Sequence, residues 1–161
     1  MDSILKYCRD LPTARFKAGD VLLAEGDRSG KLFFLINGEV EILKGDYQIN
    51  VVSDPGAIFG EISVLLDTPH MATVRATRAS SFHVADSGSG LLQSNKEIAY
   101  QLSRMLALRL HGVTSYLADL KRQFEGEHNH FGMVDEVLEV LVHQQDVAFT
   151  PGSDRDPDIK I

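Results

Sequence analysis

Residues 32–43, LFFLINGEVEIL, place two apolar runs on either side of the pair Asn37-Gly38. An Asn-Gly pair between such runs is the strongest short-range signal for a β-hairpin, because a two-residue type I′ turn needs positive φ at both central positions. The sequence therefore predicts two strands, 31–36 and 39–43, that pair with each other across this turn.

The same alternation of short β-type runs and turn residues extends outward from this point, from Thr13 to Asp86. Glycine, aspartate and proline separate the further runs, which are TARF (13–16), VLLAE (21–25), YQINVV (47–52), ATVRAT (72–77) and SSFHVA (80–85). Short runs at such regular spacing are typical of an antiparallel sandwich or barrel. We expect a mainly β fold with flanking helices.

Helical patterns flank the β region. A short amphipathic helix is expected near Leu5–Leu11, and a further helix at about 132–144. After Gly88 the chain has no proline until beyond Phe124, and apolar residues follow spacings of 4, 3, 4, 3 and 4 at Leu106, Leu110, Val113, Leu117, Leu120 and Phe124. This a/d seam predicts a long helix whose stripe is covered either by its own β domain or by the same helix of a second chain.

Composition limits the classes of function. The 161 residues carry 16 Lys and Arg against 23 Asp and Glu, a net charge of −7. Residues 1–124 hold 14 acidic and 14 basic side chains, whereas 125–161 hold 9 and 2. Without a basic face, nucleic acid is not expected as a partner.

No run of about 20 apolar residues suggests a membrane span. The N-terminus MDSILKYCRD lacks a secretory pattern, so we expect a cytoplasmic protein. The single cysteine, Cys8, cannot form an intramolecular disulfide and is expected to be structural.

Residues 55–76, PGAIFGEISVLLDTPHMATVRA, form the most unusual stretch, because two glycines precede a short helical piece that interrupts the strands. The N–H groups at a helix N-terminus bind anions, phosphate above all. Two interpretations remain open on this ground alone, namely a phosphate site and a plain crossover with a tight turn.

Within this stretch, FGEISVLLDTPHMATV (59–74) resembles the phosphate-binding cassette of cyclic-nucleotide-binding domains. The opening AGDVLLAEGDRSGKLFFLINGEVEIL (18–43) is similar to the first strands and turns of the same family, which includes the catabolite-activator proteins. The resemblance covers residues 1 to about 124. It implies an antiparallel β-roll, or jelly roll, with an N-terminal helix and a long C-terminal helix.

The resemblance also implies roles for particular residues. Gly60 and Glu61 would meet ribose and phosphate, and the backbone amides of Met71 and Ala72 would meet the phosphate. On the long helix, Thr114 and Ser115 would contact adenine. The full predicted ligand-binding set is Phe59, Gly60, Glu61, Ile62, Ser63, His70, Met71, Ala72, Thr114 and Ser115.

His70 departs from the family pattern, which has an arginine at this position of the cassette. Arginine is always charged and offers a planar fork of donors, whereas histidine has an unperturbed pKa of about 6.5 and offers one donor per nitrogen. A hydrogen bond to a charged group contributes roughly 1.5 to 3 kcal/mol, so we expect nucleotide binding about ten- to a hundredfold weaker. Protonated His70 would donate to the phosphate in a pH-sensitive way.

Three functions remain open. The first is a non-enzymatic cytoplasmic sensor for a cyclic nucleotide, which signals to a protein partner through helix movement. For such a sensor cAMP is slightly favoured over cGMP, because Met71 lacks the hydroxyl of some cGMP-preferring cassettes. The second is a cassette that no longer binds nucleotide and serves dimerisation or protein interaction. The third is a site for another small anion.

No catalytic constellation, metal site or further cofactor is expected. The pair His128 and His130 lies in a polar stretch typical of a solvated linker. We expect a nucleotide-binding-like domain at 1–124, a linker and helix at 125–145, and a disordered acidic tail at 146–161. The segment after Phe124 is too short for a helix-turn-helix domain, which favours a stand-alone module and possible homodimers through the long helix.

Overall fold

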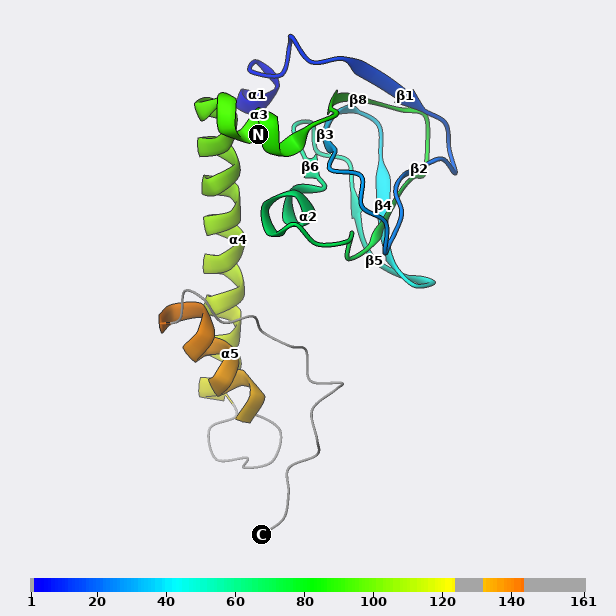
Figure 1. Cartoon of the computed structure of the whole chain (residues 1–161). Coiled ribbons are helices and arrows are strands. Elements are labelled where there is room, and N and C mark those ends of the chain that lie inside the picture. The colour runs from blue at the N-terminus through cyan, green and yellow to red at the C-terminus, as the bar shows by residue number, and fades with distance from the viewer. Residues whose placement is uncertain (1, 124–131, 144–161) are drawn as a thin grey trace. The chain divides into compact units, whose positions relative to one another are not determined.

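A computed structural model describes residues 2–123 and 132–143. Eight strands form two antiparallel sheets of four, in the orders β1-β8-β3-β6 and β2-β7-β4-β5 (Figure 1). The strands are β1 (Thr13–Phe16), β2 (Val21–Leu23), β3 (Leu32–Asn37), β4 (Val40–Lys44), β5 (Tyr47–Val52), β6 (Ile58–Phe59), β7 (Thr73–Ala76) and β8 (Ser80–Ala85). The predicted β-roll with flanking helices is confirmed.

The prediction of a β-hairpin at Asn37-Gly38 is wrong. β3 pairs with β6 and β8, whereas β4 pairs with β5 and β7, so the chain changes sheet at this point. Gly38 has a φ of 121°, but Asn37 is not among the described residues with positive φ, as a type I′ turn requires. A Cβ on Gly38 would overlap Ser80, whose Oγ accepts the N–H of Glu39 at 3.0 Å. The absence of a side chain at Gly38 therefore allows the backbone to pass close to β8.

Aromatic side chains fill the space between the two sheets. The Phe82 ring meets those of Phe16, Phe33 and Phe59 edge-on, with centroids 5.5 to 6.3 Å apart. Leu35 and Val40 complete the centre of this core. Burial of one such side chain stabilises the fold by about 1.5 to 3 kcal/mol. The core therefore stabilises the β-roll that carries the cassette.

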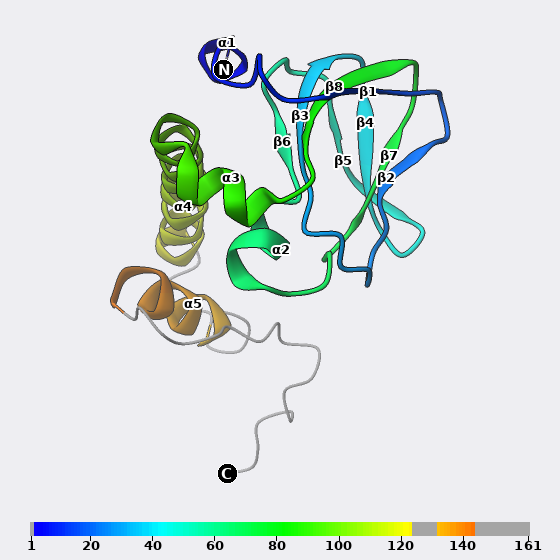
Figure 2. The same ribbon diagram turned by 45° about the horizontal axis from the view of Figure 1, so that its top comes forward.

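Five helices accompany the strands: α1 (Asp2–Leu5), α2 (Glu61–Leu66), α3 (Gly88–Ser94), α4 (Lys96–Gln123) and α5 (Gly132–His143). The helical region after Gly88 is therefore two helices. The break is at Asn95, whose backbone is extended and whose Oδ1 accepts the N–H of Ile98 at 3.1 Å, as an N-cap does. Figures 1 and 2 show α3 beside α2, outside the strands.

The thiol of Cys8 is fully buried just after α1. Its Sγ lies 3.4 Å from the carbonyl oxygen of Ile4, and burial raises the pKa of the thiol to about 11. A thiol in this environment stays protonated at neutral pH and acts as a small apolar side chain.

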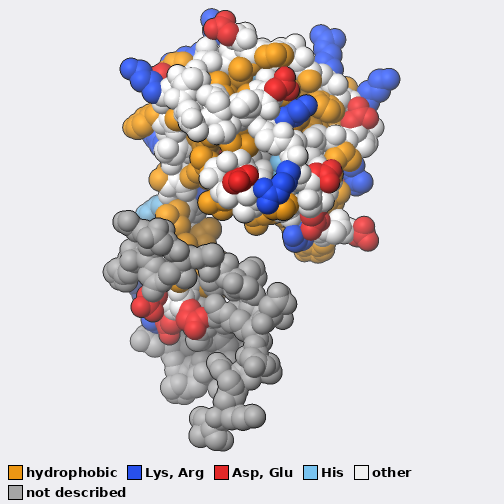
Figure 3. Space-filling model, viewed as in Figure 1, with side chains coloured by type: hydrophobic (Ala, Val, Ile, Leu, Met, Phe, Trp, Pro, Cys, Tyr) orange, Lys and Arg blue, Asp and Glu red, His pale blue; other side chains and the backbone are white. Residues whose placement is uncertain are grey.

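The chain forms two compact units that divide between Leu102 and Ser103, within α4. The first holds the roll and α1 to α3, and basic and acidic side chains are interspersed over its face in Figure 3. In the second, Lys121 of α4 forms an ion pair with Asp135 of α5. The domain limits expected from sequence stay a prediction. The segment 146–161 and the pair His128 and His130 lie outside the described residues.

The α4 seam belongs mostly to the second unit. Leu110 and Val113 are exposed there, and Leu106, Leu117 and Leu120 are half-buried. In the part of the chain that the structure describes, no helix combines the length and the apolar character that crossing a membrane requires.

Candidate functional site

The cassette opens with a glycine that no other residue could replace without strain. Gly60, the N-cap of α2, has a φ of 92°, and a Cβ there would overlap the carbonyl oxygen of Lys31. No side chain caps the helix, and its first backbone hydrogen bond runs from Val64 N–H to Gly60 O at 3.1 Å. The amides that precede Val64 are thus left at the start of the helix.

The residues around Gly60 differ in the groups that they present. Phe59 lies on β6 with its side chain in the core, so only its backbone can face a ligand. Glu61 is 6% exposed, which is unusual for a carboxylate in the first turn of a helix. The side chain of Ile62 is exposed.

His70 is held inside the protein by both ring nitrogens. Only 5% of the residue is exposed. The N–H of Ser29 donates to Nε2 at 3.3 Å, and the Ser29 hydroxyl lies 2.9 Å from the same atom. On the other side of the ring, Nδ1 lies 2.8 Å from Oγ of Ser63.

These contacts assign the tautomer of His70. Because Nε2 accepts the Ser29 amide, the hydrogen is on Nδ1, which donates to Ser63, and the Ser63 hydroxyl donates to Gly60 O at 3.1 Å. Burial lowers the pKa of His70, and the negative charge of Asp27 opposes this in part. The imidazole is therefore neutral at pH 7 and joins the β2–β3 turn to α2.

The two residues after His70 carry the amides expected to meet a phosphate. Met71 is 59% exposed, so its side chain is not folded into the roll. Among the hydrogen bonds of turns, loops and side chains in residues 2–123 and 132–143, none uses the N–H of Met71 or of Ala72 as donor. The carbonyl oxygen of Met71 is occupied, since Lys44 Nζ donates to it at 2.8 Å.

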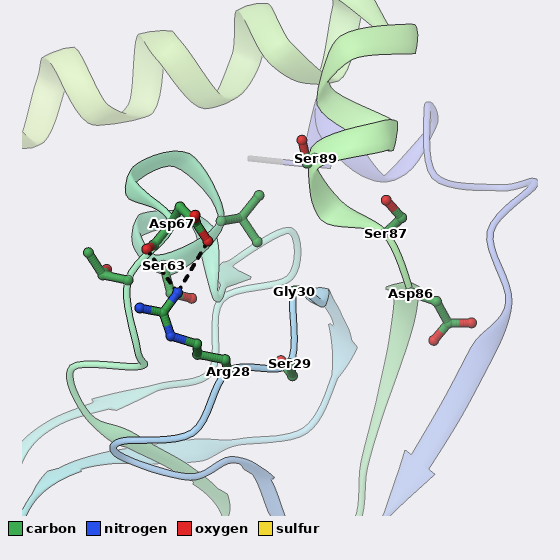
Figure 4. A pocket seen from close by; sticks show the side chains of 10 residues that line it. Arg28, Ser29, Gly30, Ser63, Asp67, Asp86, Ser87 and Ser89 are labelled. Atoms are coloured by element: carbon green, nitrogen blue, oxygen red, sulfur yellow. Dashed lines mark hydrogen bonds and ion pairs between the residues drawn. The ribbon is translucent and has the colours of Figure 1, made fainter.

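A hollow of about 220 Å³ lies beside the cassette (Figure 4). Arg28 reaches across it to Asp67, donating to the carbonyl oxygen at 3.0 Å and to the carboxylate at 3.3 Å. Its wall consists of Arg28, Ser29, Gly30, Ser63, Val64, Asp67, Thr68, Asp86, Ser87 and Ser89. With one arginine against two exposed carboxylates, this hollow does not favour an anion. Its wall includes none of Gly60, Glu61, Met71 or Ala72.

The structure thus brings eight of the ten predicted residues into one unit, at Phe59–Ser63 and His70–Ala72. Thr114 and Ser115 lie on the part of α4 that belongs to the second unit, so their contact with a purine stays a prediction. Sequence reasoning missed Ser29, because no local pattern signals a partner 41 positions away.

Comparison with known proteins identifies the family to which the roll is similar. Residues 13–89 match the family model of the cyclic nucleotide-binding domain. This segment belongs to that family. The cyclic nucleotide-binding domain includes all eight strands, α2 and the cassette residues from Phe59 to Ala72.

Two curated proteins are similar to this chain. The chain is 30% identical over 125 residues to a CRP-like cAMP-activated global transcriptional regulator of Mycobacterium tuberculosis, covering 73% of this chain and 55% of the relative. It is 37% identical over 83 residues to a cAMP-dependent protein kinase regulatory subunit of Hypocrea atroviridis, covering 52% and 17%. The chain therefore spans about half, or less, of the length of these relatives.

The fold of the domain also occurs in a solved structure. The crystal structure of the Thermus thermophilus catabolite activator protein matches with a TM-score of 0.60 at 20% identity, over 74% of this chain and 59% of that one. At this level of identity the likeness concerns the fold, and the family follows from the match to residues 13–89.

Proposed function

We propose that this protein is a non-enzymatic, cytoplasmic regulatory module that binds a cyclic nucleotide, with cAMP favoured over cGMP. The observation that supports this most is the cassette itself. Gly60 begins α2 in a left-handed conformation beside the buried Glu61, and the amides of Met71 and Ala72 have no acceptor among the turn and side-chain hydrogen bonds of the described residues. The ribose and the phosphate of the nucleotide would bind to these groups. The names of the two curated relatives support cAMP.

Nucleotide binding would shift the equilibrium between two arrangements of α2 relative to the helices that follow it. A protein partner would recognise the resulting change in structure. The exposed Leu110 and Val113 support a homodimer through α4 as part of this output. Nucleic acid is not proposed as a partner.

The placement of His70 supports a second candidate. A buried, neutral imidazole that already binds Ser29 and Ser63 offers no free donor to a phosphate. A cassette without that donor would serve as a dimerisation or protein-interaction module.

Calorimetric titration of the full chain at pH 6 and pH 7.5 tests both candidates. The ligands are cAMP and cGMP, with 5′-AMP and inorganic phosphate as controls for the cyclic phosphate and for a bare anion. Binding of cAMP with little or no binding of 5′-AMP is expected. Absence of binding by both cyclic nucleotides at both pH values would reject the sensor, whereas phosphate binding alone would indicate a small-anion site.

A further inference from the structure

Lys44, at the end of β4, donates to the carbonyl oxygen of Met71. This carbonyl belongs to the same peptide unit as the N–H of Ala72, one of the two amides proposed to bind phosphate. The Nζ of Lys44 donates to Met71 O at 2.8 Å and lies 2.9 Å from Oε1 of Glu25. The two bonded residues, Lys44 and Met71, are 27 positions apart in the chain. This contact therefore reflects the fold of the roll rather than a local turn.

Glu25 holds the ammonium group in place. Its Oε2 accepts the N–H of Gly45 at 2.8 Å, and its own N–H donates to Oγ1 of Thr73 at 3.0 Å. The hydrogen bond from Gly45, together with the weaker effect of that from Lys44, lowers the pKa of the Glu25 carboxyl, which is ionised at neutral pH. Lys44 is thus fixed between the β4–β5 turn and the end of the cassette.

The peptide bond between Met71 and Ala72 links this cation to the other side of the chain. The described residues contain no cis peptide, so the carbonyl of Met71 and the N–H of Ala72 point in opposite directions from one planar unit. A positive charge on the oxygen draws electron density from the nitrogen and makes the N–H a stronger donor.

We infer that Lys44 is a positioning residue for the nucleotide phosphate, which it favours by polarising the Met71–Ala72 peptide from behind. It supplies indirectly part of the positive potential that an arginine at the position of His70 would supply by contact. The inference rests on the proposed function, in which the Ala72 amide meets the phosphate.

Titration of cAMP into the full-length variants tests the effect on binding. Lys44→Met should bind about three- to tenfold more weakly than the unmodified chain. Lys44→Arg, which keeps the charge and a donor, should restore the affinity to within about twofold. Lys17→Met removes the same charge from an exposed side chain and should have no effect. Equal affinity of Lys44→Met and the unmodified chain would overturn the inference.

A second variant separates charge from the integrity of the turn. Glu25→Gln removes the negative charge next to Lys44 but keeps an oxygen that can accept from its ammonium group, so this variant should bind cAMP at least as tightly as the unmodified chain. A loss as large as that of Lys44→Met would mean that the turn, and not the charge, controls binding, and the inference would fail.

The amide signal of Ala72 in the nucleotide-free protein gives a readout that does not depend on cAMP. In Lys44→Met, its proton and nitrogen resonances should move upfield, and in Lys17→Met they should not move. An unchanged Ala72 signal in Lys44→Met overturns the inference even if cAMP binds. If the signal moves but the unmodified chain binds no cAMP, the proposed function fails, and the role of Lys44 toward the nucleotide phosphate fails with it.

Discussion

The Nδ1 atom of His70 lies 2.8 Å from the hydroxyl oxygen of Ser63, seven residues earlier in the cassette. Because the other ring nitrogen accepts from Ser29, the imidazole joins the end of the cassette, its helix and the β2–β3 turn. A residue expected to contact phosphate is therefore placed as a bridge within the protein.

Removal of this bridge should destabilise the fold. His70→Ala leaves Ser29 and Ser63 without their shared partner and opens a cavity, so we expect the free energy of unfolding to fall by about 2 to 4 kcal/mol. Chemical denaturation measures this. His111→Ala, at an exposed position of α4, should change it by less than about 0.5 kcal/mol. Similar values for the two variants would contradict the bridging role.

Stability should depend on pH through His70. Burial lowers the pKa of the folded-state imidazole, whereas in the unfolded chain it titrates near 6.5. Between these two values the unfolded chain binds more protons, so acidification favours unfolding. The contribution is complete above about pH 6.5 and is lost as the pH falls below it. Denaturation at pH 7.5 and 5.5 should show a smaller pH dependence in His70→Gln than in the unmodified chain. An equal dependence would refute the assignment.

Gly38 should tolerate no side chain. Gly38→Ala combines strain at a φ of 121° with overlap of Ser80, and we expect a loss of more than about 3 kcal/mol or failure to fold. Gly19→Ala has a φ of 91° but open space around it, so only the conformational strain of about 1 kcal/mol should remain. Thermal unfolding of both variants distinguishes crowding from strain, and equal losses would argue against the crowding.

A measurement of molecular mass can test whether two chains associate through the α4 seam. Val113→Asp together with Leu117→Asp places two charges on the seam and should convert a dimer to a monomer in light scattering. The control is His111→Asp with Ser115→Asp, which adds the same charges off the seam and should remain dimeric. A monomeric mass for the unmodified chain would remove the dimer from the proposal.

Local patterns predicted the strands better than their pairing. The runs 13–16, 47–52 and 80–85 match β1, β5 and β8, because alternation and turn residues act over a few positions. No local pattern predicts that Gly38 lies against Ser80, since the hydrogen bond beside this contact joins Glu39 and Ser80, which are 41 positions apart in the chain. Asn95 did carry a local signal, as asparagine is a strong N-cap, but the continuous apolar spacing concealed it.

For the candidate site, sequence located the positions but not their orientation. The cassette motif identified His70 as the departure from the family, and Glu61 as its acidic group. Whether the imidazole faces a ligand or the protein depends on Ser29, which only the closed roll brings to it. The same holds for Lys44, whose contact with Met71 exists only once β4 lies beside β7.

The enclosure of Cys8 provides an internal reporter. Since it is the single sulfhydryl of the sequence, a thiol-specific reagent can modify only this atom, and only after the N-terminal segment has opened. The rate of modification under native conditions therefore measures the free energy of that opening, without any label being engineered into the protein.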